Sequence, residues 1–268
     1  MPETRLATAA ALLGLVLLLL WQATPLVLQG VFGVITLLAA WEWSGLCRGL
    51  RGPRRGLLLI ALGSIMLALH ALPVTGASAA FTVALLWWAS ALRLVIRYPA
   101  VPGWLEHPGM QAIIIIVALA PAWLALARLD QAGRGLLLLC LALVWAADSG
   151  AYVVGRRFGR IKLCPQVSPG KTVEGAAGGL AAAAGAGLAG GFALGLQGWW
   201  LAALVGLTVA CAAVSVVGDL AESLFKRRAG VKDSSHLLPG HGGVLDRIDA
   251  LIAAAPLFAL AAPVLVRG

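Results

Sequence analysis

Long apolar stretches separated by short polar segments run along the whole chain. A helix needs about 20 apolar residues to cross the hydrocarbon core of a bilayer. At that length the pattern predicts nine membrane-spanning helices, near residues 6–22, 25–47, 56–73, 76–96, 110–128, 134–155, 172–195, 198–221 and 248–266. The apolar residues form unbroken runs and do not alternate with polar ones, so a membrane β-barrel is excluded. We therefore expect an all-α, polytopic integral membrane protein.

The first stretch has two interpretations, because Arg5 precedes a Leu-rich core as it would in a signal peptide. No clear small-residue cleavage site follows, and Pro25 begins the second stretch almost at once. These features favour a retained first helix.

Composition excludes other classes of protein. The chain of 268 residues is 61% apolar and 12% charged, whereas a soluble domain has about 25% charged residues. A soluble enzyme is therefore excluded, and so is a disordered chain, which requires low hydrophobicity. The four cysteines are widely scattered, which favours neither disulfides nor a zinc site.

The chain has a net charge of +9, and its basic residues are concentrated in a few loops. Sixteen of the 20 Lys and Arg residues lie in four of them: Arg48, Arg51, Arg54, Arg55, Arg93, Arg97, Arg156, Arg157, Arg160, Lys162, Lys171, Lys226, Arg227, Arg228, Lys232 and Arg247. Such a bias marks cytoplasmic loops and predicts a cytoplasmic N-terminus. Phosphate-rich partners are a second explanation of this charge, and nucleic acid is not expected as a partner.

The two halves of the chain differ in character. Residues 1–130 hold about five plain spans, whereas residues 131–268 carry acids, glycines and polar loops at 155–174 and 222–249, which we expect on the cytoplasmic face. Gly187, Gly191 and Gly195 are spaced four apart, a pattern that lets helices approach closely. They predict either tight packing within one subunit or the contact face of a homodimer.

Acidic residues are few and gather at the ends of predicted helices: Asp148, Asp219, Glu222, Asp246 and Asp249. Asp219, Glu222, Ser223 and Lys226 recur at helical spacing and would share one face. Converging carboxylates without cysteines suit a hard cation such as Mg²⁺. The same acids could instead pair with neighbouring Arg and Lys side chains, and the residue types alone leave both interpretations open. Within the second span, Glu42 either bonds inside the bundle or lines a route for lipid.

Residues 223–249 form the most polar stretch of the chain. Its cations suit phosphate oxygens, and the side-chain-poor turn 239–243 could bring backbone N–H groups close to an anion. Asp246-Arg247-Ile248-Asp249 then begins a helix whose dipole also favours phosphate. Enzymes of phosphoryl or nucleotidyl transfer combine carboxylates that bind a metal with basic groups that bind phosphate. This stretch contains both kinds of residue.

A second polar segment ends in Gly170-Lys171-Thr172, which resembles the tail of a Walker A loop. The first glycine of that motif would fall at Pro165, and no β-strand is expected before it, so a P-loop is rejected. The turn with Lys171 at the start of the seventh span is still a candidate anion site.

Residues 223–249 resemble the signature of the phosphatidate cytidylyltransferases, also called CDP-diacylglycerol synthases. The fixed positions of that signature are all met here: Ser223, Lys226, Arg227, Lys232, Asp233, Pro239, His241, Gly242, Gly243, Asp246, Arg247 and Asp249. Residues 148–156 and 168–175 are also similar to the family, although Gly170 stands where relatives often carry Lys or Asn. The specific resemblance covers roughly residues 148–249.

The resemblance implies that CTP and phosphatidate react to CDP-diacylglycerol and pyrophosphate at the cytoplasmic face of the inner membrane. It implies Mg²⁺ and a second cation, for which K⁺ is a candidate. It assigns the metal to Asp219, Asp246, Asp148 and Asp249, and catalysis to Asp219, Asp246, Lys226 and Arg247. Substrate phosphates would contact Ser168, Lys171, Thr172, Arg227, Lys232, His241, Gly242 and Gly243.

Two alternatives use the same residues differently. A CTP-dependent lipid kinase would share the metal and the nucleotide but release CDP. A secondary transporter would also carry intramembrane acids and Gly-broken helices. No inverted repeat relates the two halves, and the polar residues gather at one membrane face, which argues against transport.

Overall fold

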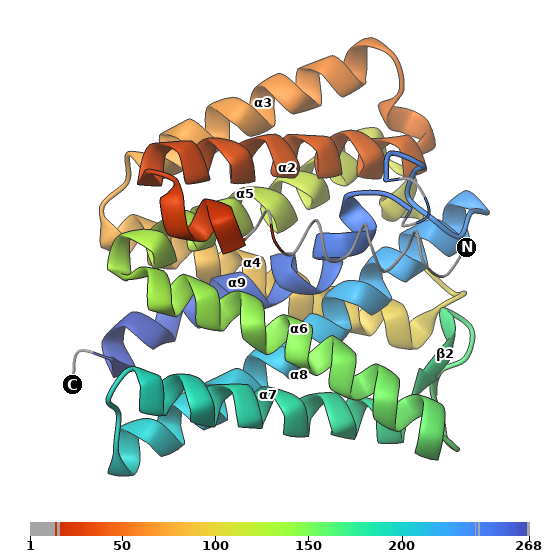
Figure 1. Cartoon of the computed structure of the whole chain (residues 1–268). Helices are drawn as coiled ribbons and strands as arrows, with labels where there is room; N and C mark the ends of the chain where they lie inside the picture. The colour runs from red at the N-terminus through yellow and green to blue at the C-terminus, as the bar shows by residue number, and fades with distance from the viewer. Residues whose placement is uncertain (1–13, 15–16, 239, 241, 267–268) are drawn as a thin grey trace.

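The structure, a computed structural model, describes residues 14, 17–238, 240 and 242–266 (Figure 1). Its helices are α2 (Pro25–Leu46), η1 (Arg48–Leu50), α3 (Pro53–His70), α4 (Val74–Arg97), η2 (Gly103–Glu106), α5 (Pro108–Ala132), α6 (Arg134–Phe158), α7 (Val173–Ala193), α8 (Gly198–Ala229) and α9 (Leu245–Leu265). Two short strands, β1 (Lys162–Cys164) and β2 (Ser168–Thr172), join α6 to α7.

Eight helices of the described part are long and apolar enough to cross a membrane. This confirms the predicted all-α, polytopic class and eight of the nine predicted spans. Most of the expected first span, 6–22, lies outside the described residues, and residues 17–22 are helical. Helices result because a bilayer offers no water to the backbone, so each N–H and C=O must bond within its own segment.

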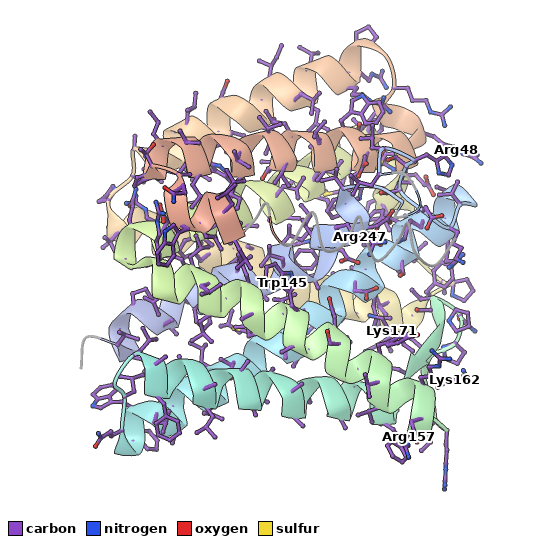
Figure 2. All side chains as sticks on the ribbon, viewed as in Figure 1. Arg48, Trp145, Arg157, Lys162, Lys171 and Arg247 are labelled. Atoms are coloured by element: carbon purple, nitrogen blue, oxygen red, sulfur yellow. The ribbon has the colours of Figure 1, made fainter. Side chains whose placement is uncertain are left out.

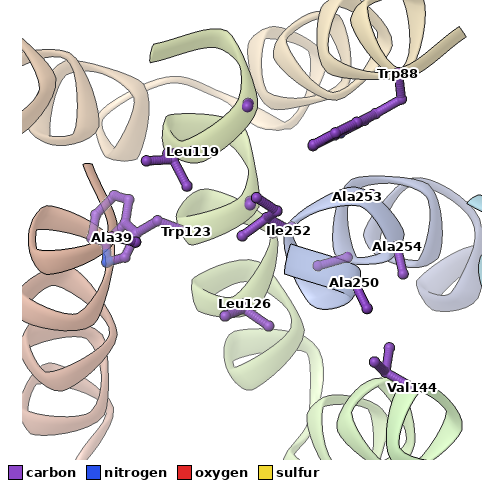
Figure 3. Close-up of a cluster of buried hydrophobic side chains, with 14 of the residues drawn as sticks. Ala39, Trp88, Leu119, Trp123, Leu126, Val144, Ala250, Ile252, Ala253 and Ala254 are labelled. Atoms are coloured by element: carbon purple, nitrogen blue, oxygen red, sulfur yellow. The ribbon is translucent and has the colours of Figure 1, made fainter. Parts of the chain in front are cut away.

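Helix α5 is the centre of the bundle. In the 18-residue apolar stretch of α5, 72% of the residues are buried inside the protein. The corresponding share for α3, at the periphery, is 17%. Figure 3 shows Leu119, Trp123 and Leu126 of α5 between Ala39 of α2 and Ile252 of α9. The Trp123 indole N–H also donates to the Gln29 carbonyl of α2 at 3.0 Å. The N-terminal half therefore packs directly against α9, which carries part of the polar signature.

Helix α8 is longer than the sequence pattern predicted. The predicted span ended at residue 221, but the helix continues to Ala229 and is 32 residues long, about 48 Å at 1.5 Å per residue. The expectation that residues 223–229 form a loop was wrong, because no helix breaker occurs there and basic residues favour the last turn. Gly230, at φ 74°, ends the helix in the left-handed region.

Glycines of α7 permit close contact with α8 within one chain. A methyl group added at Gly187 would overlap the Thr208 side chain, and one at Gly191 would overlap Leu201. Gly195 instead lies in the turn after α7 at φ 77°. For Gly187 and Gly191, the prediction of packing within a subunit is therefore confirmed.

The polar connections gather at one end of the bundle. Arg48, Arg157, Lys162 and Lys171 all lie at the right-hand end in Figure 2, where the hairpin and the segment between α8 and α9 also lie. At the opposite end, Arg128 donates to the carbonyls of His70, the last residue of α3, and of Leu72 in the turn that follows. Arginine there serves as a helix cap, which explains its presence outside the basic end.

The strands β1 and β2 pair antiparallel, with Lys162 opposite Thr172. The expectation that no strand precedes Gly170-Lys171-Thr172 was therefore wrong. The hairpin is fixed from outside, because the Arg227 side chain of α8 donates to the Val167 carbonyl at 3.2 Å. Such tertiary contacts stabilise a short two-stranded element that would be marginal alone.

Candidate functional site

A cavity of about 420 Å³ opens at the basic end between α6, β2, α7 and α8. Asp148, Lys171 and Asp219 line its polar part, and Leu180 and Val216 line its apolar part. A pocket lined by both charged and apolar side chains suits a ligand that combines phosphate with hydrocarbon.

Acids and bases from four elements meet beside this cavity. Lys171 Nζ of β2 lies 2.5 Å from Asp219 Oδ2 of α8. Asp148 of α6 lies within Coulombic range of Asp219, Lys171 and Arg247. Asp249, buried on α9, interacts with Asp219 and Lys171 in the same way. The structure thus brings together residues separated by up to a hundred positions in the chain.

The predicted polar face of α8 is confirmed. The Ser223 hydroxyl donates to Asp219 Oδ1 at 3.4 Å, and Lys226 forms an ion pair with Glu222 one turn earlier. Lys226 Nζ also lies 2.8 Å from Asp246 Oδ1 of α9. Lys226 therefore joins α8 to the start of α9 through Asp246, and it also pairs with Glu222 of its own helix, which is only 2% exposed.

Asp246 organises the loop before α9. Besides the contact with Lys226, its carboxylate accepts the Gly243 N–H at 2.7 Å and the Ser234 N–H at 3.0 Å. Backbone donors and one ammonium group thus surround this carboxylate, which holds both ends of residues 234–243 together. This places Asp246 as a loop-positioning residue.

Glu42 is a buried acid whose partners the sequence did not specify. It comes from α2, is 1% exposed, and accepts the Val244 N–H at 2.9 Å and the Leu245 N–H at 2.6 Å. The hydroxyls of Ser234 and Ser235 also donate to it, at 3.2 and 2.5 Å. The prediction that Glu42 bonds within the bundle is confirmed. A lone acid in an apolar helix was the signal, but its partners are about 200 residues away.

Several other predicted site residues have structural contacts of their own. The Thr172 hydroxyl accepts the Gly175 N–H at 3.1 Å and caps α7. Ser168 begins β2, Arg227 fixes the hairpin, and Lys232 is exposed. Gly243 is buried against Glu42, and Gly242 forms a bridge with Leu238. His241 lies outside the described residues.

The carboxylates of Asp148 and Asp219 suit a metal ion that is bound jointly by the protein and by the substrate. Among the described residues, no three His, Cys, Asp or Glu side chains converge closely enough to hold a metal ion by themselves. Mg²⁺ in nucleotide enzymes is commonly bound by one or two carboxylates together with substrate phosphates. Asp148 and Asp219 line one cavity beside Lys171 and are suited to that role.

Fold and site together define an integral membrane protein with a cavity lined by acidic and basic side chains at one end of its helical bundle. A profile of the "Cytidylyltransferase family" matches residues 3–265, and the chain belongs to this family. The chain is 48% identical to the "Phosphatidate cytidylyltransferase" of Pseudomonas aeruginosa over 240 residues, 87% of this chain and 88% of the relative. It is 38% identical to the Haemophilus influenzae protein of the same name, over 96% of this chain and 97% of the relative. The Bacillus subtilis protein of that name is 40% identical over 48% of each chain.

Proposed function

We propose that this protein transfers the cytidylyl group of CTP to phosphatidate, yielding CDP-diacylglycerol and pyrophosphate. Its family and the names of relatives that align along most of the chain support this activity. The structural observation that carries it is the cavity shared by Asp148, Lys171 and Asp219, which apolar side chains such as Leu180 and Val216 also line. A water-soluble nucleotide and a lipid phosphate could both reach such a cavity.

In this reaction an oxygen of the lipid phosphate bonds to the α-phosphorus of CTP, and the bond from that phosphorus to the pyrophosphate oxygen breaks. The lipid phosphate is already anionic at neutral pH, so no strong general base is required. Lys171 and Arg247, beside Asp148, would neutralise the phosphate charge that develops. Lys226 is paired with Glu222 and Asp246, so we assign it to holding the loop in place.

We assign Mg²⁺ to Asp219 and Asp148, with Asp249 and Asp246 as the further acids nearby. When bound, the ion would neutralise phosphate charge and orient the triphosphate for in-line displacement. The pairing of Lys171 with Asp219 supports this assignment, because a Mg²⁺–phosphate complex could take the carboxylate while the displaced ammonium binds phosphate oxygens. K⁺ remains a candidate for a second cation.

We further infer that the basic end faces the cytoplasm and that the membrane is the inner membrane of a bacterial cell. The concentration of arginine and lysine at that end supports this orientation. CTP is a cytoplasmic nucleotide, so the cavity would open on the side where CTP is available.

The test uses purified protein in detergent with CTP, phosphatidate and Mg²⁺, followed by product analysis. We expect pyrophosphate and CDP-diacylglycerol, loss of turnover with EDTA and recovery with Mg²⁺. Asp219→Asn should lower the rate by at least about 10²-fold, on the scale of removing a principal electrostatic group. Glu106→Gln, an exposed acid at the same end, is the matched control. CDP release, or near-normal turnover by Asp219→Asn, would contradict the proposal.

A further inference from the structure

A second cavity, of about 330 Å³, opens at the same end of the bundle and shares no lining residue with the first. Its walls are the last turn of α2, η1, the first turn of α3 and residues 229–236. Arg48, Arg51 and Arg55 line it, together with Trp41, Asp233 and His236. The proposed reaction uses none of these three arginines.

The three guanidinium groups are not neutralised within the described chain. No ion pair involves Arg48, Arg51 or Arg55 among the described residues. The Arg55 side chain lies over the Trp41 ring, with its Cζ 5.0 Å from the centroid. Its Nε is buried, and no described group accepts its hydrogen. A buried donor without an acceptor is costly, which indicates that an acceptor is supplied from outside.

The two acids that line this cavity do not supply an acceptor for the three arginines. Glu42, which lies at the inner end, already accepts four hydrogen bonds from the loop before α9 and from the first turn of that helix. Asp233 is exposed and forms no ion pair with the arginines. Three planar guanidinium groups around one space match the oxygens of a phosphate group, which each can bind through two N–H donors.

The surroundings of the cavity indicate that this phosphate belongs to a lipid. Trp41, Leu38 and Leu57 are 38%, 38% and 66% exposed on α2 and α3, next to the arginines in the chain. These two helices lie side by side (Figure 1), and α3 is the least buried of the eight spans in the described part of the chain. A head group in the cavity would therefore leave its acyl chains against apolar helix surface. A free phosphate ion has no hydrocarbon part that could contact this surface.

We propose that Arg48, Arg51 and Arg55 form a binding site for the phosphate group of an anionic membrane phospholipid, separate from the catalytic cavity. Basic pockets between membrane helices are suited to such head groups. The ligand class is a phosphodiester lipid with one negative charge and two acyl chains, which the proposed reaction does not consume.

The test is equilibrium binding of dioctanoyl phosphatidylglycerol to the full-length protein in detergent, without CTP, by titration in native mass spectrometry. Each arginine near a membrane surface contributes about a fivefold increase in affinity. The variant R48Q/R51Q/R55Q should therefore bind this lipid about 100-fold more weakly. The control R93Q/R97Q/R157Q removes the same charge from exposed arginines and should bind within about threefold of the unmodified protein.

Three further measurements complete the test. Dioctanoyl phosphatidylcholine should bind at least tenfold more weakly than the glycerol lipid, and millimolar inorganic phosphate should not displace the latter. R51Q alone changes an exposed residue and should weaken binding about fivefold. This single variant replaces the triple variant in the test if the triple variant does not fold. Equal losses in both triple variants, equal binding of the choline lipid, or displacement by inorganic phosphate would each overturn the proposal. Turnover of CTP is measured separately, so failure of the lipid site is distinct from failure of the proposed reaction.

Discussion

Replacing Glu42 by Gln removes one carboxylate oxygen and keeps the shape of the side chain. Both oxygens of Glu42 act as acceptors, each for one serine hydroxyl and one backbone N–H. The amide group of Gln is a donor. Whichever way it turns, it faces either the Val244 or the Leu245 N–H, and one of these donors at the start of α9 loses its acceptor.

The magnitude follows from these contacts. A buried N–H left without an acceptor costs about 1–3 kcal/mol. A negative charge at a helix N-terminus contributes up to about 2 kcal/mol in partly buried geometry. The sum, about 3 kcal/mol, weakens the attachment of the loop before α9 to α2. Because about 1.4 kcal/mol corresponds to a factor of ten, turnover should fall by about 10²-fold if the loop must be attached for catalysis.

The assay combines the rate of CDP-diacylglycerol formation with hydrogen–deuterium exchange of residues 233–245. Glu42→Gln should lower the rate and increase exchange in that segment, whereas exchange in α5 should not change. Glu106→Gln is the matched control, because Glu106 pairs with Arg228 at the same end and is 67% exposed in its side chain. Unchanged turnover together with unchanged exchange in Glu42→Gln would refute the reasoning.

Three further predictions concern stability and reactivity. Lys226→Met should lower the free energy of unfolding by about 3 kcal/mol, because it leaves two buried carboxylates without their cation; an unchanged thermal midpoint in detergent would contradict this. Gly187→Ala should destabilise the protein by about 1–3 kcal/mol by overlap with Thr208. Gly185→Ala, where the methyl group meets open space, should not destabilise, and equal effects would disprove the packing argument. Burial raises the pKa of the Cys47 thiol to about 12, so the thiol stays protonated at pH 8; fast maleimide labelling of a variant with only this cysteine would contradict that.

The spans could be predicted from the sequence because each depends on its own residues. An apolar run of sufficient length must be helical in a bilayer, whatever surrounds it. The end of α8 could not be predicted in this way. Four of the seven residues 223–229 are polar, so hydropathy ends the predicted span at residue 221, but Ser223 and Lys226 are buried in the structure. Ser223 bonds to Asp219, and Lys226 pairs with Glu222 on the same helix and with Asp246 of α9. These contacts favour a helix where hydropathy alone indicated an end.

Some properties of the candidate site could likewise be predicted from the sequence, and others could not. The identities of Asp148, Lys171 and Asp219 as chemical groups could be inferred from residue type and motif spacing, and the structure places them around one cavity. The role of Thr172 as a helix cap and of Arg227 as an anchor for the hairpin could not. Polar residues in a signature look alike in sequence whether they bind substrate or hold the backbone that does.

The sequence by itself determined the membrane class, the spans and the chemical groups, because these follow from local hydropathy and from side-chain chemistry. Only the tertiary structure decided the long-range pairings: Glu42 with the start of α9, Lys226 with Asp246, and Lys171 with Asp219. A buried charge requires partners, but nothing in the local sequence says which distant segment supplies them. Helix packing makes that choice, since α2 and α9 pack against α5 and α8 packs against α9, which brings these distant residues to the same end of the bundle.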